Sequence, residues 1–100
     1  MIEVRETDTY AGWFAKLQDR QARARIDVRI RRLQLGNPGD VQSVGEGVSE
    51  LRFHFGPGYR VYFTQLGATV VILLAGGDKS SQPNDIATAL SLARNLTEAP

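Results

Sequence analysis

The stretch ELRFHFGPGYRVYF, residues 50–63, restricts the fold of this chain more than any other segment. Apolar and polar residues alternate in it, which is typical of β-strands that bury one face. The apolar side consists of Leu51, Phe53, Phe55, Val61 and Phe63. The polar side consists of Glu50, Arg52, His54, Arg60 and Tyr62. Between the two halves lies Gly56-Pro57-Gly58, which favours a tight turn. The stretch therefore predicts a β-hairpin with one face in a core and one polar face.

Further strands are predicted on both sides of the hairpin, whose own strands span residues 48–55 and 59–65. Residues 1–6 alternate apolar and charged side chains, and residues 41–44 also have a period of two. The run from Thr69 to Ala75 is mostly apolar without alternation. We expect it to form a strand that is buried on both faces inside the sheet.

Three helices are predicted around these strands. The first follows candidate N-cap residues at positions 7–9 and carries aromatic residues at helical spacing, which we expect in the core. The second spans residues 20–35 and ends at the stop signal Gly36-Asn37-Pro38-Gly39. The third has Pro83 in its first turn, a position that tolerates proline.

This order of elements predicts an α+β fold with a small, meander-rich antiparallel sheet. The two N-terminal helices should pack on one face of the sheet, and a C-terminal helix completes the domain. We expect the other face to stay partly open and to carry the polar side of the hairpin. A chain of 100 residues supports one hydrophobic core, so residues 1–100 should form a single domain.

Composition excludes several classes of protein. The chain has no cysteine, which excludes a disulfide framework and a thiolate zinc site. The N-terminal residues lack the apolar region of a signal peptide, and the longest apolar run, residues 70–75, is too short to cross a bilayer. No cluster of ligand residues at metal-binding spacing occurs. We therefore expect a cytoplasmic protein without a metal or cofactor and without a membrane contact.

The polar side of the hairpin is the first candidate site. Cross-strand pairing should bring Arg52, His54 and Arg60 within about 5 Å of one another, where they would repel unless an anion or Glu50 lay among them. Lys79 follows the strand at 69–75 and could join the arginines around one phosphate. Such a group suits RNA cleavage, with His54 as acid or base. The alternative is a solvated strand face on which Glu50 pairs with both arginines.

The second predicted helix is the other candidate. Residues 16–32 hold seven basic and two acidic residues, a net charge of +5, although the whole chain carries only +1. Arg25, Arg29 and Arg32 share one strip beside the apolar stripe. This strip could bind RNA phosphates, including those of ribosomal RNA, or an acidic protein segment, or it could simply face solvent.

Three segments together resemble the addiction-module killer proteins. They are GVSELRFHFGPGYRVYF at 47–63, LLAGGDKSSQ at 73–82 and DIATALSLA at 85–93. These killer proteins are toxins of type II toxin-antitoxin modules in the RelE/ParE superfamily, and the similarity is to the HigB-like branch. The resemblance extends over nearly the whole chain in order and length.

The resemblance implies a small antiparallel sheet with two N-terminal helices on one face. It also implies a toxin that inhibits translation by cutting messenger RNA on the ribosome. Arg52 and Arg60 would stabilise the transition state, Lys79 would assist, and His54 would be placed for proton transfer. The residues expected to contact RNA or the ribosome are Arg25, Arg29, Arg32 and Tyr62.

The partners implied by the resemblance are a cognate antitoxin, the ribosome and messenger RNA. HigB-like toxins usually pair with a small helix-turn-helix antitoxin of the HigA type, so a toxin-antitoxin hetero-oligomer is expected. Two alternatives remain. ParE-like relatives keep the fold without ribonuclease residues and poison DNA gyrase, and a regulatory binding module without toxicity is the third hypothesis.

Overall fold

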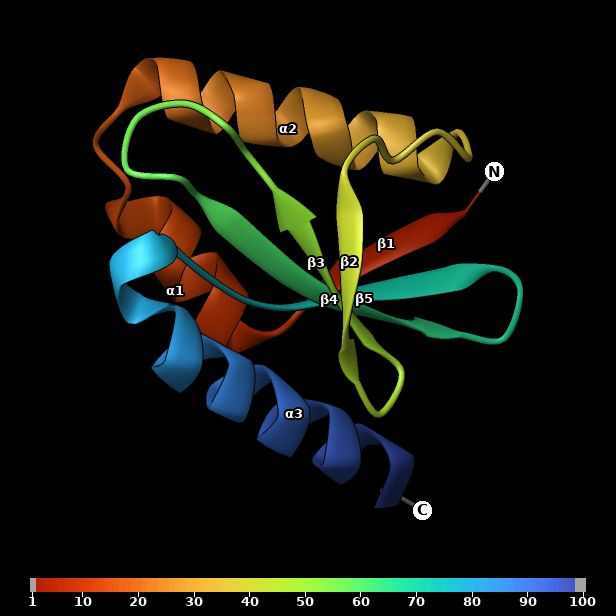
Figure 1. The fold of residues 1–100 in the computed structure, drawn as a ribbon. Coiled ribbons are helices and arrows are strands. Elements are labelled where there is room, and N and C mark those ends of the chain that lie inside the picture. Colours follow the sequence, from red (N-terminus) through yellow and green to blue (C-terminus); the bar gives the residue numbers. More distant parts are fainter. Residues whose placement is uncertain (1, 99–100) are drawn as a thin grey trace.

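The hairpin predicted at residues 50–63 forms the middle of a five-stranded sheet with helices on both faces (Figure 1). The structure is a computed structural model that describes residues 2–98. In chain order the elements are β1 (Glu3–Glu6), α1 (Asp8–Lys16), α2 (Arg20–Gln34), β2 (Val41–Gly45), β3 (Val48–Arg52), β4 (Arg60–Leu66), β5 (Val70–Gly77), the short 3-10 helix η1 (Lys79–Ser81) and α3 (Gln82–Glu98). The α+β fold is confirmed.

The sheet has the strand order β1-β5-β4-β3-β2. The strands β2 to β5 form an antiparallel meander, and Leu51 of β3 lies opposite Val61 of β4, as the period-two pattern requires. β1 pairs in parallel with β5, which the sequence did not indicate. β5 has a neighbour on each side and is buried along most of its length, so the prediction of an interior strand is confirmed.

Local capping sets the ends of the helices. The Thr7 side chain accepts a hydrogen bond from the Tyr10 backbone N–H at the start of α1, and Asp19 caps α2 through the Ala22 N–H. α2 ends just before Gly36, which has a φ of 86°, a conformation that glycine adopts without strain. The predicted stop signal is therefore confirmed.

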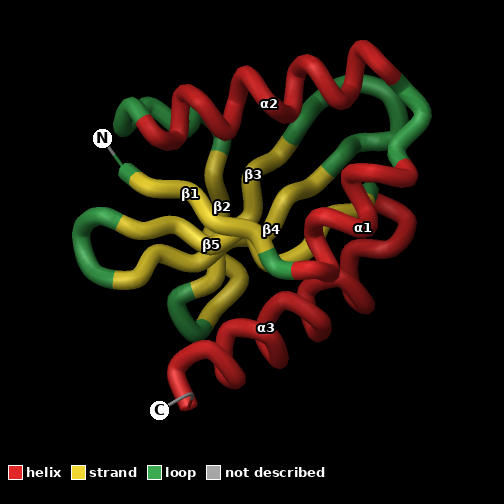
Figure 2. The backbone as a smooth tube through the Cα atoms, turned by 180° about the vertical axis from the view of Figure 1, so that it is seen from behind, coloured by secondary structure: helices red, strands yellow, loops and turns green. Residues whose placement is uncertain are grey.

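The two N-terminal helices cover one face of the sheet, as predicted (Figure 2). Tyr10 of α1 and Ile26 of α2 are buried in a core with Leu51, Val61 and Leu73 of the strands. The partly buried Trp13 and Phe14 pack against the same core, so the aromatic residues of α1 serve packing.

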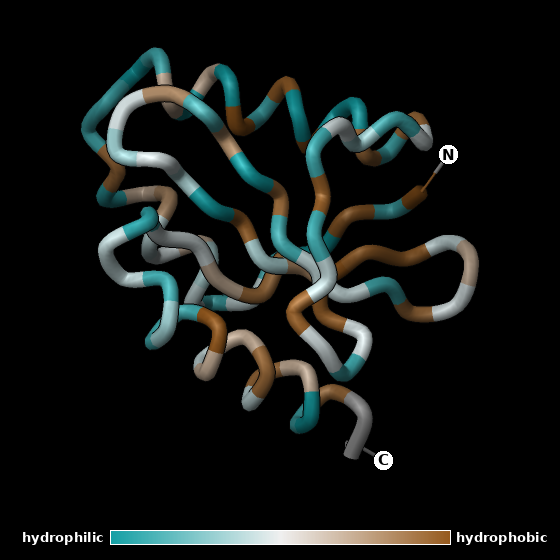
Figure 3. Tube along the Cα trace, in the orientation of Figure 1, coloured by the Kyte–Doolittle hydropathy of each residue, from teal (hydrophilic) through white to brown (hydrophobic). Residues whose placement is uncertain are grey.

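The prediction of a partly open second face is wrong. α3 lies across that face, and its apolar residues recur along the helix (Figure 3). Ala89 and Ala93 of α3 pack on a second core that includes Val48, Tyr62 and Leu74. The sequence predicted a C-terminal helix but not the face of the sheet on which it packs. None of the helices described within residues 2–98 combines the length and apolar character needed to cross a lipid bilayer.

Candidate functional site

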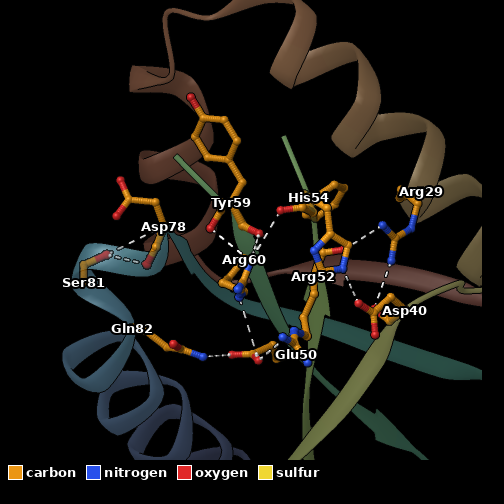
Figure 4. Close-up of polar contacts among 12 residues, drawn as sticks. Arg29, Asp40, Glu50, Arg52, His54, Tyr59, Arg60, Asp78, Ser81 and Gln82 are labelled. Carbon is orange, nitrogen blue, oxygen red and sulfur yellow. Dashed lines mark hydrogen bonds and ion pairs between the residues drawn. The ribbon is translucent and has the colours of Figure 1, made fainter. Parts of the chain in front are cut away.

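The loop between β3 and β4 is held in shape by Arg60. Within the loop the Phe53 N–H donates to the Tyr59 carbonyl at 3.0 Å, and the Gly58 N–H donates to the Phe55 carbonyl at 3.0 Å. Arg60 Nη1 donates to the Gly58 carbonyl at 3.1 Å and to the Tyr59 carbonyl at 3.0 Å. The Arg60 side chain is only 4% exposed. Its guanidinium therefore stabilises the conformation of the loop by these hydrogen bonds (Figure 4).

Glu50 lies beneath the start of α3, and its one carboxylate faces both arginines of the hairpin. Its carboxylate Oε1 is 3.9 Å from Nε of Arg52 and 3.9 Å from Nε of Arg60. These distances are too long for hydrogen bonds, so the attraction is electrostatic. Gln82 of α3 donates a hydrogen bond of 2.9 Å to Glu50 Oε2. Glu50 thus faces Arg52 and Arg60 as the alternative predicted, but the strand face around Glu50 is buried under α3 and not solvated.

His54 is exposed and contacts a carboxylate from another loop. Its Nε2 lies 2.5 Å from Asp40 Oδ2, and the side chains are 66% and 42% exposed, respectively. The hydrogen bond from His54 lowers the pKa of the Asp40 carboxyl below its usual value, and the nearby Arg52 and Arg29 add to this effect. A carboxylate on Nε2 fixes the orientation of the imidazole ring.

Arg29 of α2 positions the backbone that carries Asp40. Its Nε donates to the Pro38 carbonyl at 3.0 Å, Nη2 donates to the Asp40 carbonyl at 3.1 Å, and Nη1 donates to the Arg52 carbonyl at 2.9 Å. Burial lowers the pKa of Arg29. Arg29 thus ties α2 to β3 and to the segment before β2, and its donors are used by the protein itself.

His54, Arg60 and Lys79 border one hollow of about 300 Å³ beside the β3–β4 loop. Lys79 reaches it because its backbone N–H donates to the Pro57 carbonyl at 3.4 Å. Asp78 caps the turn that carries Lys79, accepting a 2.8 Å hydrogen bond from the Ser80 N–H. Hydrogen bonds from Ser80 lower the pKa of Asp78.

The remaining predicted site residues lie elsewhere. Arg52 is not among the residues that line this hollow, although it contacts Glu50. Tyr62 is fully buried under α3, and burial followed by the neighbouring Glu50 raises its pKa. The open surface expected for Tyr62 does not exist, because α3 covers it. Arg25, Arg29 and Arg32 line a separate groove beside α2.

Asp40 and Gln82 contribute to the site without having been predicted. Asp40 directly follows the helix stop signal at residues 36–39 and had no predicted role, and only the pairing of β2 with β3 brings it near His54. Gln82 is the first residue of α3, and its sequence position next to Pro83 gave no sign of a contact with Glu50. Within residues 2–98 no group of three or more histidine, aspartate or glutamate side chains is arranged to hold a metal ion.

The comparison with known proteins gives two matches that extend across the hairpin, Lys79 and most of α3. Residues 12–97 match the sequence profile of a family described as "Phage derived protein Gp49-like (DUF891)". A protein of Haemophilus influenzae (strain ATCC 51907 / DSM 11121 / KW20 / Rd), described as "Uncharacterized protein", is 48% identical over 95 residues. The aligned residues make up 95% of this chain and 96% of that relative.

Proposed function

Because the chain belongs to the Gp49-like family of phage-derived proteins, we propose that it is the toxin of a toxin-antitoxin pair and that it cleaves messenger RNA on the ribosome. The proposal includes membership of the HigB-like branch of the RelE/ParE superfamily. Support comes from one observation, that His54, Arg60 and Lys79 border the same hollow. A backbone phosphate is the ligand that suits one titratable ring between two cationic side chains.

In the proposed reaction the ribose 2′-oxygen attacks the adjacent phosphorus while the bond from phosphorus to the 5′-oxygen breaks. The products are a 2′,3′-cyclic phosphate and a free 5′-hydroxyl. His54 transfers one proton, either from the 2′-hydroxyl or to the leaving oxygen, and water accepts or supplies the other. Lys79 stabilises the negative charge that develops on the phosphate. Asp40 is a positioning residue, because it holds the His54 ring. The reaction requires no metal or cofactor.

Arg60 has a mixed role in this proposal. It borders the hollow, but its Nη1 atom is engaged by loop carbonyls and its Nε faces Glu50. Loss of toxicity in Arg60→Ala would therefore combine lost chemistry with a disordered loop. The exposed side chains of His54 and Lys79 give a cleaner test, because neither contributes to the core.

The experiment induces the protein in bacteria without an antitoxin and follows methionine and thymidine incorporation over the first minutes. We expect an early fall in methionine incorporation, and His54→Ala and Lys79→Ala should lose it. Lys16→Ala is the matched control, because Lys16 is the other lysine of the chain and is exposed on α1. Its effect on translation should equal that of the unaltered chain.

Three outcomes contradict the proposal. An early fall in thymidine incorporation would favour the gyrase-directed alternative. Normal growth with abundant folded protein would favour a regulatory binding module. If His54→Ala and Lys79→Ala both inhibit translation as strongly as Lys16→Ala, the hollow is not the site. Co-expression of a helix-turn-helix antitoxin that forms a hetero-oligomer with this chain should restore growth whenever the unaltered chain or a variant is toxic.

A further inference from the structure

A second hollow lies on the other side of His54, between α2 and the β3–β4 loop. We call it the α2 groove; its volume is about 370 Å³, and its lining residues are Ala24, Arg25, Val28, Arg29, Arg32, Phe53, His54 and Phe55. Figure 1 shows the loop running alongside the N-terminal half of α2. On α2 the positions 25, 28, 29 and 32 follow one another at helical spacing, so they form one continuous strip. The groove is thus formed by α2 on one side and by the β3–β4 loop on the other.

The floor of the α2 groove is apolar, and its aromatic rings are covered by arginines. The Arg25 guanidinium carbon lies 4.5 Å from the centre of the Phe55 ring, and that of Arg29 lies 4.6 Å from the centre of the Phe53 ring. Val28 lies between these arginines on the helix and is 58% exposed, so it offers an apolar contact within the groove. The α2 groove therefore has an apolar centre that is bordered by arginine side chains.

The charged side chains that line the groove are basic, although the Asp40 carboxylate lies next to His54. Its lining includes three arginines and a histidine but no aspartate or glutamate among the described residues. Residues 16–32 carry a net charge of +5, so the surrounding helix adds to the positive potential. The groove is complementary to a ligand that is both acidic and partly apolar.

We propose that the α2 groove binds an acidic polypeptide segment that places one large apolar side chain against Val28 and carboxylates beside Arg25 and Arg32. If the proposed function holds, the antitoxin supplies this segment. Only the identification of the antitoxin as the partner rests on the proposed function. RNA fits less well for two reasons. Arg25 and Arg29 already cover the phenylalanine rings on which bases would stack. Arg29 also donates to three carbonyls, which leaves fewer donors for phosphate.

The test measures binding of fluorescein-labelled peptides to the purified full chain by fluorescence anisotropy. The probe is a short helix-forming peptide with glutamates around a central phenylalanine. One comparison peptide replaces the phenylalanine by serine, and another replaces the glutamates by glutamines. We expect both changes to weaken binding, and added salt to weaken binding of the acidic probe.

Val28→Glu should weaken binding of the acidic probe about tenfold or more, because it puts a carboxylate into the apolar centre. Leu35→Glu is the matched control, since Leu35 is an exposed apolar residue at the end of the same helix, outside the groove. The affinity of Leu35→Glu for the acidic probe should equal that of the unaltered chain within experimental error. Circular dichroism and thermal melting verify that both variants are folded.

Four results would overturn the inference, and the first three concern the peptides. They are no measurable binding of the acidic probe, equal weakening by Val28→Glu and Leu35→Glu, and equal affinity for the serine-containing peptide. A fourth is tight binding of a single-stranded RNA oligonucleotide that Val28→Glu abolishes while the peptide does not compete. None of these measurements depends on toxicity. The proposal that the α2 groove binds an acidic segment and the proposed ribonuclease function can therefore be contradicted independently.

Discussion

Glu50 and His54 both belong to the polar side of the hairpin in sequence, yet their environments differ completely. Glu50 is 2% exposed and lies between two arginines and Gln82, whereas His54 lies two residues beyond the end of β3 and is exposed. Alternation predicted the side of the strand for Glu50 correctly. It could not predict that a helix from the other end of the chain covers that side.

Glu50 should be among the most sensitive polar positions. Glu50→Ala leaves the 4%-exposed Arg60 without its counter-charge, and removal of one partner from a buried pair costs about 3–5 kcal/mol of unfolding free energy. Urea denaturation measures the loss. Glu46→Ala is the control, because its partner Arg94 is exposed and the effect should be much smaller. Equal losses would show that burial does not distinguish the two pairs.

The contact between Asp40 and His54 predicts a change in a carboxyl titration. The hydrogen bond from His54 is the main cause of the lowered pKa of Asp40, so His54→Ala should raise that pKa toward about 3.9, the usual aspartate value. Carbon-detected NMR titration measures it, and Glu46, whose pKa is lowered by Arg94, is an internal control that should not move.

The sign of the linked stability effect follows from the direction of the shift. A carboxyl whose pKa is lower in the folded than in the unfolded protein stabilises the fold above about pH 3.9 and loses that contribution as pH falls through the lowered value. The stability difference between the unaltered chain and His54→Ala should therefore shrink in acid. An unchanged pKa of Asp40 in His54→Ala would contradict the contact.

At the scale of elements, β5 is where the two layers of helices come closest to the sheet. A Cβ atom at Gly76 would overlap the indole of Trp13 in α1, and a Cβ at Gly77 would overlap Asp85 of α3. Two adjacent residues of one strand point to opposite faces. The two glycines thus let helices approach from both sides, although the strand predicted from the sequence ended at Ala75.

Gly76→Ala should destabilise the protein by about 1–3 kcal/mol, because the added methyl group forces Trp13 away from the strand. Gly12→Ala is the matched control within α1. No atom lies within 4 Å of a Cβ built there, so the better helix propensity of alanine should stabilise the chain by about 0.5–1 kcal/mol. Thermal unfolding measures both changes. A neutral Gly76→Ala would mean that α1 packs less closely on β5 than described.

At the scale of the whole molecule, the sequence predicted which segments are helices and strands better than how they pack. The hairpin, the end of α2 and the interior position of β5 all followed from local patterns. Three features depended on contacts between distant segments, namely the parallel pairing of β1 with β5, the cover of α3 on the second face and the approach of Asp40 to His54. Local periodicity carries no information on such pairings, so the buried position of Tyr62 could not be predicted.

The sheet has a core on each face, and the strands that separate the two cores are shared by both, so we expect them to unfold together. Leu74→Ala removes buried volume on the α3 side and should cost about 2–5 kcal/mol. Trp13, the only tryptophan of the chain, reports from the opposite face. Its fluorescence should show the same lowered midpoint in urea as far-UV circular dichroism. If the Trp13 transition kept its original midpoint while the dichroism transition moved, the two faces would be separate cooperative units, with α3 able to detach from an intact layer of α1, α2 and sheet.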